Sequence, residues 1–313
     1  MHTIMLPQLS GDRPFVTDGG LETTLIFHEG LELPDFASFD LLKDPAGVDA
    51  LRRYYAPYVA IARERGTGIV LDTATWRASR DWGERLGYSP AELAEANRRA
   101  VELIREIAEA APDVPSVLNG VVGPRGDGYV VGKAMTADEA AEYHAEQIGT
   151  FAGAGVDMVS AITMTYVDEA IGVTRAASSV GLPVVISFTV ETDGALPSGE
   201  ALDSAIARVD EATDGAPAYY MVNCAHPTHF ADALTTDAGW LARVKAIRAN
   251  ASSCSHAELD VATELDRGDV ADLAGWYERL HSILPDLRVV GGCCGTDHEH
   301  VTAIAEALVG VRS

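Results

Sequence analysis

The chain has 313 residues and a mass of 33.1 kDa, a length that suits one large barrel or two ordinary domains. Apolar residues make up 47% of the sequence and charged residues 22%, which is globular composition and excludes a largely disordered chain. A formal net charge of −24 repels phosphate backbones and anionic lipid, so we expect no nucleic-acid binding and no attachment to a membrane.

The first residues predict a cytoplasmic protein. Met1–Pro7 contains no basic segment followed by an apolar stretch, and no run of 18 apolar residues occurs in the sequence. Four cysteines in a chain of this length, two of them adjacent at Cys293 and Cys294, do not resemble a secreted disulfide scaffold. The cysteines are better interpreted as metal ligands or reactive thiols.

The sequence does not determine the oligomeric state, and a homo-oligomer is compatible with it.

Short β-rich runs alternate with amphipathic helical patterns along the whole chain. We predict strands within eight runs: Pro14–Gly20, Gly68–Trp76, Ser116–Gly123, Asp157–Thr165, Pro183–Val190, Ala218–Cys224, Val244–Asn250 and Arg288–Gly292. Ser89, Thr136 and Thr296 each stand three residues before a glutamate, which predicts three helix-capping boxes. Glycines such as Gly66 and Gly155 are predicted to end helices before the next strand.

Eight strand–helix units predict a single α/β domain over residues 1–313, a closed (β/α)8 TIM barrel. An open doubly wound sheet is the alternative. Against it, the segment Asp18-Gly19-Gly20-Leu21-Glu22 after the first run does not fit a dinucleotide-binding glycine motif. No linker rich in proline, glycine or serine divides the chain.

Polar residues at the carboxyl ends of the predicted strands are the candidate site residues, because a barrel of this kind carries its active site there. In chain order they are Asp18, Asp72, Thr73, Thr75, Asn119, Thr163, Thr165, Glu191, Asn223, Cys224, Asn250, Ser252, Cys293 and Cys294.

Three cysteines in this set predict a metal site. Cys224 ends the sixth predicted strand, and Cys293 and Cys294 end the eighth, so their side chains can converge in one layer of the barrel. Three thiolates with an open fourth position are a ligand set for catalytic Zn²⁺, which would favour the thiolate form of an incoming thiol. The alternative is that these cysteines are small buried apolar residues.

Two histidine pairs have spacings that could also be interpreted as metal sites of a hydrolytic barrel. His226 and His229 flank a proline at a predicted helix start, where a capping role is common. His298 and His300 begin the last predicted helix and, two residues apart, do not share a helical face. We therefore place the hydrolase second to the thiolate site.

Several segments resemble the homocysteine S-methyltransferase family of zinc barrels. They are Asp18-Gly19-Gly20, Leu71-Asp72-Thr73-Ala74-Thr75, Gly120-Val121-Val122-Gly123-Pro124, Val222-Asn223-Cys224 and Gly291-Gly292-Cys293-Cys294-Gly295-Thr296. The resemblance implies that the three cysteines bind zinc and that Asp18 lies near the amino group of a thiol amino acid. It also implies that Asn223 shapes the pocket beside the metal.

The resemblance further implies a small-molecule thiol acceptor and a cationic methyl donor. The expected reaction moves a methyl group from S-methylmethionine or S-adenosylmethionine to homocysteine and gives methionine. Alternatives are another small thiol as acceptor, betaine as donor, or a barrel that only binds zinc or an amino acid.

One departure from the family concerns substrate binding. Family members commonly carry Glu-Thr after the fourth strand, where this chain has Ile162-Thr163. Glu191, after the fifth strand, could supply the missing carboxylate or be an exposed loop acid. Thr73, Thr163 and Asn250 complete the expected substrate contacts.

Two further features of the sequence can be interpreted in two ways. Trp76 could offer a cation–π face to the donor or pack under a loop. The polar stretch 250–260 after the seventh strand could form a lid or a solvated connector, and Cys254 within it is not needed for the zinc set.

Overall fold

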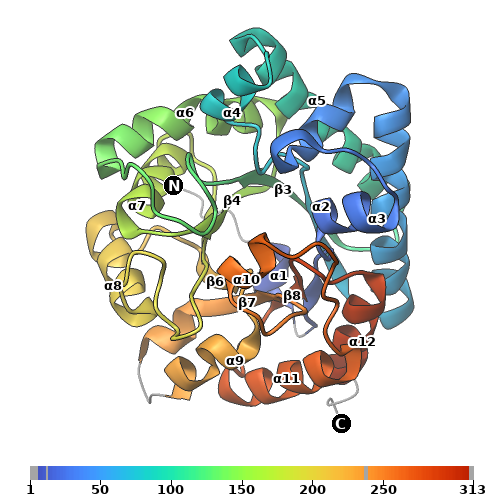
Figure 1. Ribbon diagram of the computed structural model, residues 1–313, viewed down its shortest axis with the longest axis vertical. Coiled ribbons are helices and arrows are strands. Elements are labelled where there is room, and N and C mark those ends of the chain that lie inside the picture. Colours follow the sequence, from blue (N-terminus) through green and yellow to red (C-terminus); the bar gives the residue numbers. More distant parts are fainter. Residues whose placement is uncertain (1–5, 12, 236–238, 310–313) are drawn as a thin grey trace.

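The computed structural model describes residues 6–11, 13–235 and 239–309 of the chain. Within these residues, eight parallel strands close into one barrel in chain order, and helices surround it (Figure 1). The pairing of Phe15 in the first strand with Val289 in the last closes the ring. The predicted (β/α)8 TIM barrel is therefore confirmed.

The strands that form the barrel are β1 (Phe15–Val16), β2 (Gly68–Asp72), β3 (Ser116–Val122), β4 (Met158–Met164), β5 (Val184–Phe188), β6 (Tyr219–Asn223), β7 (Val244–Ala249) and β8 (Val289–Gly292). All eight predicted runs contain a strand. The runs predicted for β1 and β2 were too long, because residues 17–20 and 73–76 leave the ladder and form loops at the carboxyl end.

The α-helices are α1 (Pro7–Ser10), α2 (Leu21–Thr23), α3 (Pro45–Arg65), α4 (Arg80–Arg85), α5 (Pro90–Glu109), α6 (Ala137–Ala154), α7 (Val167–Ser179), α8 (Leu202–Thr213), α9 (Pro227–Phe230), α10 (His256–Asp260), α11 (Val270–Ile283) and α12 (His298–Val309). Gly66 and Gly155 end α3 and α6 in the left-handed conformation, with φ of 62° and 78°. Both predicted glycine stops are confirmed.

Two of the three predicted capping boxes are confirmed. The hydroxyl groups of Ser89 and Thr136 accept from the third backbone N–H of α5 and α6, and the glutamates there reciprocate. The third prediction was wrong, because the Thr296 hydroxyl donates to the Cys293 carbonyl at 2.7 Å. The Asp297 carboxylate accepts instead from the N–H groups of Glu299 and His300, and α12 begins one residue later than the predicted box requires.

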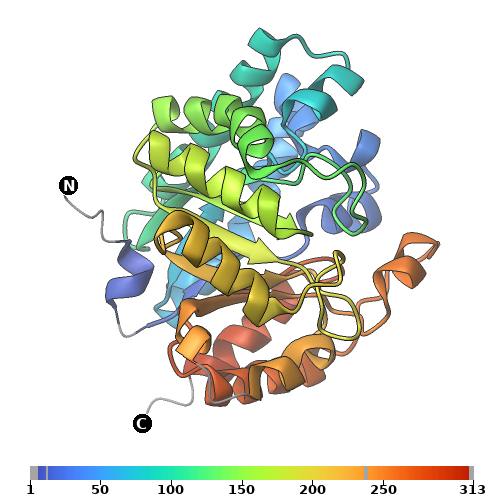
Figure 2. The same cartoon turned by 90° about the vertical axis from the view of Figure 1, so that its left-hand side faces the viewer.

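Two apolar layers hold the barrel together. One lies between the strands and the surrounding helices, and the other fills the barrel interior with side chains such as Val117, Met158 and Val185. The short helix α1 closes the amino-terminal end, where Leu6 joins the interior cluster and Gln8 Nε2 lies 3.4 Å from the Tyr219 hydroxyl oxygen. In Figure 2, α1 lies at one end of the barrel, at the left of the view.

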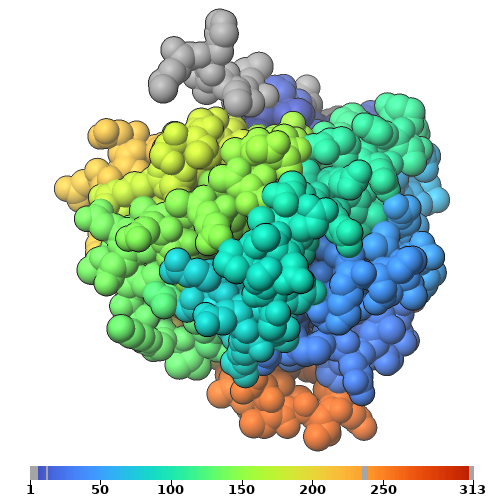
Figure 3. All heavy atoms as spheres, turned by 90° about the horizontal axis from the view of Figure 1, so that it is seen from above, coloured from blue at the N-terminus to red at the C-terminus, as the bar shows by residue number. Residues whose placement is uncertain are grey.

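The loops at the carboxyl ends of the strands form the opposite end of the molecule. The segment that contains α10 (orange) stands out from this end in Figures 2 and 3. No helix among the described residues combines the length and apolar character needed to cross a membrane.

Candidate active site

A cavity of about 330 Å³ opens at the carboxyl end of the barrel. Its walls come from the segments after β1, β2, β3, β7 and β8 and from residues at the ends of β4 and β6. This is the end at which barrel enzymes carry their active sites. The cavity is therefore the candidate site.

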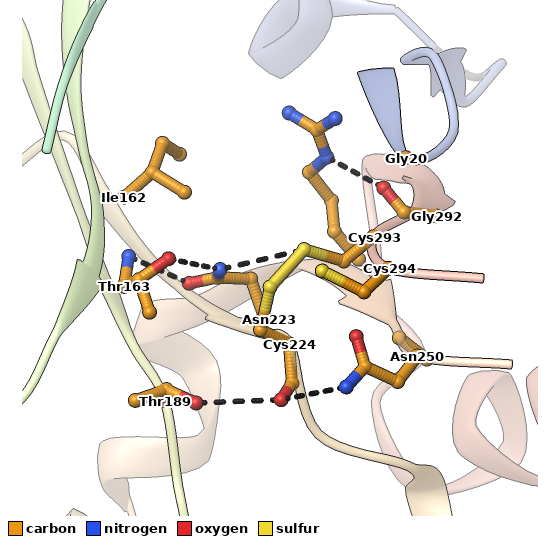
Figure 4. The surroundings of a disulfide bond; sticks show 12 residues. Gly20, Ile162, Thr163, Thr189, Asn223, Cys224, Asn250, Gly292, Cys293 and Cys294 are labelled. Carbon is orange, nitrogen blue, oxygen red and sulfur yellow. Dashed lines mark hydrogen bonds between the residues drawn. A yellow bond between two sulfur atoms is a disulfide. The ribbon is translucent and has the colours of Figure 1, made fainter. Parts of the chain in front are cut away.

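The three predicted cysteines meet in this cavity. The sulfur atoms of Cys224, Cys293 and Cys294 lie within 4.8 Å of one another, and all three residues line the cavity (Figure 4). Among the described residues, no other group of at least three His, Cys, Asp and Glu side chains is close enough to share an ion. Cys254 is exposed and outside the cluster, as expected.

The oxidation state of the cluster differs from the expected three thiolates. A disulfide bond joins Cys224 to Cys293, and the Cys294 thiol is free. Burial raises the pKa of the Cys294 thiol, and the Tyr129 hydroxyl lies 3.6 Å from its sulfur. Because a disulfide sulfur carries no thiolate charge, the cluster fits a soft divalent metal only after this bond is reduced.

The backbone around the cluster folds tightly. Cys224 itself has φ of 53°, and its carbonyl accepts from Asn250 Nδ2 at 3.1 Å and from His256 Nε2 at 2.5 Å. A Cβ on Gly20 would lie 2.7 Å from the Cys293 carbonyl oxygen, and a Cβ on Gly292 would lie 1.9 Å from the Thr296 hydroxyl oxygen. Side chains at these glycines would push the cysteine loop out of place.

Asn223 forms hydrogen bonds with its neighbours beside the cluster. Its Oδ1 accepts from the Thr163 N–H at 3.0 Å, and its Nδ2 donates to the Thr163 hydroxyl at 2.9 Å. The same Nδ2 lies 4.0 Å from the Cys293 sulfur (Figure 4). Thr163 has φ of 65°, a strained conformation that these two hydrogen bonds hold in place.

Asp18 lies in the cavity wall, but the protein already engages both of its carboxylate oxygens. Oδ1 forms an ion pair with Arg248, and Oδ2 accepts from the Tyr54 hydroxyl at 2.9 Å. Arg248 also forms an ion pair with Asp72, so two buried carboxylates share one guanidinium. Burial, partly offset by Arg248 and reinforced by the Asp72 charge, raises the pKa of Asp18 to about 7. A direct contact between Asp18 and a substrate amino group stays a prediction.

The other predicted substrate residues divide into two groups. Thr73, Thr163 and Asn250 line the cavity, and the Asn250 Oδ1 is buried without a hydrogen-bond partner. Glu191 lies outside the cavity wall, where its Oε1 is 3.2 Å from His256 Nδ1. The Glu191 side chain therefore contacts His256, which lines the cavity, but is not itself among the residues of the cavity wall.

Ile162 and Trp76 also line the cavity. Ile162 leaves this part of the wall without a charge. The Trp76 ring carries the Arg77 guanidinium at 4.1 Å from its centroid, and Trp76 Nε1 donates to the Ile162 carbonyl at 3.3 Å. One face of the tryptophan therefore already holds a cation of the protein itself.

The segment 250–260 contributes to the cavity wall. Asn250, Ser252 and His256 line the cavity, and the His256 ring packs against that of Tyr129 with centroids 4.2 Å apart. The segment that follows, through Asp266, forms part of the cavity rim.

The histidine pairs have structural partners. His226 Nδ1 caps α9 by accepting from the Thr228 N–H, as expected, and His229 Nε2 donates to the Ser253 carbonyl at 2.9 Å. His300 is buried, with Nδ1 2.8 Å from Asp297 Oδ1. None of these three residues lines the cavity, so the structure offers no support for the hydrolase alternative.

Several charged or polar cavity residues were not among the predicted site residues; they include Glu22, Arg77, Tyr129 and Arg248. Arg248 lies inside a predicted strand, two residues before its polar end. Glu22 lies two residues after Asp18-Gly19-Gly20, and Arg77 lies two residues after the segment that ends at Thr75. This closeness to predicted site segments was the available signal.

The fold and the site define a class: a TIM-barrel enzyme with a sulfur cluster at its catalytic end. Residues 15–308 match the family described as homocysteine S-methyltransferase, and the chain belongs to that family. This confirms the predicted resemblance and the predicted methyltransferase class.

Relatives cover nearly the whole chain. Homocysteine S-methyltransferase 4 from Zea mays is 26% identical over 321 aligned positions, which cover 94% of this chain and 89% of the relative. The metallated form of the Escherichia coli homocysteine methyltransferase MmuM superposes with a TM-score of 0.77 at 18% identity, covering 97% of this chain and 99% of that one. Its oxidized form gives 0.74 at 18% identity, with coverage of 94% and 96%. Both E. coli structures therefore have the same fold as this protein.

Proposed function

We propose that the protein is a zinc-dependent S-methyltransferase that methylates homocysteine to methionine, with S-methylmethionine or S-adenosylmethionine as donor. The observation that carries this proposal is the convergence of Cys224, Cys293 and Cys294 in the cavity. The maize and E. coli relatives are named for homocysteine methylation, which supports the choice of acceptor.

Cys224, Cys293 and Cys294 would hold the metal once the Cys224–Cys293 bond is reduced. When bound, Zn²⁺ would stabilise the thiolate form of the acceptor sulfur at neutral pH. Asn223 would fix the positions of Thr163 and of the Cys293 side chain relative to each other through the contacts described above. Asn250 and His256 would fix the backbone of Cys224 from the other side.

Methyl transfer needs an in-line approach of two reactants. A lone pair of the acceptor thiolate forms the new S–CH₃ bond while the bond between the methyl carbon and the donor's cationic heteroatom breaks, and the donor leaves as a neutral molecule. The acceptor proton goes to solvent when the thiolate forms.

The charge of the cavity wall supports a cationic donor. Its acidic residues outnumber its two arginines and are Asp18, Glu22, Asp72, Asp127, Asp260, Glu264 and Asp266. Such a wall raises the local concentration of a sulfonium or quaternary ammonium compound.

A metal and turnover assay on the reduced protein tests the proposal. Wild type is expected to bind about one zinc per chain, and serine variants of Cys224, Cys293 and Cys294 should each lose tightly bound metal, whereas Cys254→Ser should not. Stoichiometric zinc in all three variants would refute the site.

Turnover is measured as methyl thioether by mass spectrometry. Homocysteine and other small thiols are each paired with S-methylmethionine, S-adenosylmethionine and betaine. Homocysteine with a sulfonium donor is the expected pair. Methylation of a different thiol, or from betaine alone, would correct the substrates, and the absence of turnover with every pair would favour a binding barrel.

A further inference from the structure

Arg77 is a buried cation in the cavity wall, and no carboxylate of the described residues forms an ion pair with it. It is 7% exposed, and its guanidinium carbon lies 4.1 Å from the ring centroid of Trp76 and 3.8 Å from that of Trp82. Nη1 donates to the Gly126 carbonyl at 2.8 Å. Contacts with two rings fix the guanidinium and leave its edges for hydrogen bonding.

The Nε–Nη2 edge of Arg77 has no acceptor among the described residues. Nε is buried without a partner, and Nη2 makes no hydrogen bond within the described chain. Elsewhere in this protein, Arg63 and Arg243 use the same edge to bind Asp113 and Asp210 through two parallel hydrogen bonds. Nη2, which is not enclosed as Nε is, therefore offers a charge-assisted hydrogen bond to a carboxylate that comes from a ligand.

Glu22 supplies the opposite charge in the same cavity. Its Oε1 accepts from the Ser38 hydroxyl at 2.8 Å, and no cation within the described residues forms an ion pair with it. Glu22 and Arg77 are not paired with each other. A cavity wall that carries the Glu22 carboxylate and the Arg77 guanidinium, neither of them in an ion pair, is complementary to a zwitterion, because each of these two charges lacks an opposite charge in contact with it.

The segment of Glu22 packs against the sulfur cluster. The neighbouring Thr23 hydroxyl accepts from the Gly295 N–H at 3.3 Å, one residue beyond Cys294, and Gly20 approaches the Cys293 carbonyl. Ile162 contributes no charge to this cavity. Glu22 and the cysteines therefore line the same cavity, and the amino group of a ligand whose sulfur lies at the cysteines can contact Glu22.

We propose that Glu22 binds the ammonium group and Arg77 the carboxylate of an α-amino-acid thiol whose sulfur lies at the cysteine cluster. This assignment rests on the proposed function and adds the recognition of the amino-acid end of the acceptor. It makes Glu22 and Arg77 substrate-binding residues that discriminate amino-acid thiols from simple thiols.

Binding measurements with matched thiols test each half of the assignment. Reduced, zinc-loaded protein is titrated calorimetrically with homocysteine, with 3-mercaptopropylamine, which lacks the carboxylate, and with 4-mercaptobutyrate, which lacks the amino group. Wild type should bind homocysteine roughly 10- to 100-fold more tightly than either analogue, since each loses a charge-assisted contact.

The variants should lose this preference selectively. Arg77→Met should bind homocysteine and 3-mercaptopropylamine about equally, and Glu22→Gln should bind homocysteine and 4-mercaptobutyrate about equally. Zinc content and circular dichroism should match those of wild type. Arg85→Lys, which changes an exposed arginine over the same Trp82 ring, and Glu102→Gln, on an exposed helix face, serve as controls and should keep the full preference.

The outcomes separate this assignment from the proposed function. If folded, zinc-loaded variants keep the wild-type preference, or lose affinity for all three thiols equally, the roles of Glu22 and Arg77 are refuted while the methyltransferase proposal stands. If wild type binds neither zinc nor homocysteine, the proposed function fails first.

Discussion

Arg248 and Asp18, 230 residues apart in the chain, form a buried ion pair at the floor of the cavity. The same guanidinium pairs with Asp72, so it links the loop after β1, the end of β2 and strand β7. Its removal would leave two buried carboxylates without a cation.

We expect Arg248→Met to lower the free energy of unfolding by about 3–5 kcal/mol, the cost of breaking a buried pair. Urea denaturation followed by circular dichroism measures the loss. Arg63→Met is the matched control, because Arg63 pairs with Asp113 on the surface and should cost at most about 1 kcal/mol. An equal, small loss in both variants would contradict a structural role for the buried pair.

The raised pKa of Asp18 predicts a pH dependence of stability. Burial raises this pKa from 3.8 to about 7 in the folded protein, so the folded state binds a proton more tightly than the unfolded chain. The resulting stabilisation is complete below pH 3.8 and is lost as the pH rises through about 7.

Urea unfolding of wild type and of Asp18→Asn between pH 4 and pH 7.5 checks this sign. The stability of wild type relative to the variant should fall as the pH rises, whereas Asp203→Asn, an exposed control, should leave the profile unchanged. Parallel profiles for wild type and Asp18→Asn would show that Asp18 does not titrate in this range.

The Cys224–Cys293 bond predicts that metal loading depends on reduction. Denatured protein prepared without reductant should show two free thiols, Cys254 and Cys294, and fully reduced protein should show four. Because only the reduced cluster offers three thiolates, zinc should bind stoichiometrically to the reduced form alone. Thiol titration and metal analysis on the same samples test this, and equal zinc content in both would contradict it.

Gly20 predicts a packing requirement behind the cysteine loop. A Cβ there would lie 2.3 Å from the Thr23 hydroxyl oxygen and 2.7 Å from the Cys293 carbonyl oxygen, so Gly20→Ala should cost about 1–3 kcal/mol and weaken zinc binding. Gly149→Ala is the control, because that glycine of α6 has open space around its Cβ position and alanine favours the helix. Denaturation and zinc titration compare the two, and an unchanged Gly20→Ala protein would show that the loop can move.

The sequence predicted the barrel and the meeting of the cysteines because both depend on regular rules. Strand–helix alternation defines the barrel, and strand ends of a barrel share one face, so Cys224 and Cys293 had to approach each other. The disulfide between them could not be predicted, since it depends on sulfur positions within a few ångströms rather than on spacing.

The charged part of the site was less accessible to sequence reasoning. Arg248 lies in a strand whose apolar neighbours favour a buried position, and its pairing with Asp18 and Asp72 follows only from the closed barrel. The Arg77 guanidinium packs against two tryptophan rings, one of them in α4. The Glu191 carboxylate contacts His256 instead of lining the cavity. Such contacts depend on loop geometry, which residue order alone leaves undetermined.

The position of α1 at the amino-terminal end of the barrel has a consequence for the order in which substrates bind. The cavity lies at the opposite end, where His256, Leu259 and Asp260 of α10 contribute to its wall, so we expect reactants and products to pass there. If the acceptor sulfur lies at the deep cysteine cluster, a donor that arrived first would stand in its path. The proposed reaction should therefore follow a compulsory order, with the thiol entering before the donor and the methylated product leaving last. With S-adenosylmethionine as donor, the methylated product should then inhibit competitively toward the thiol alone.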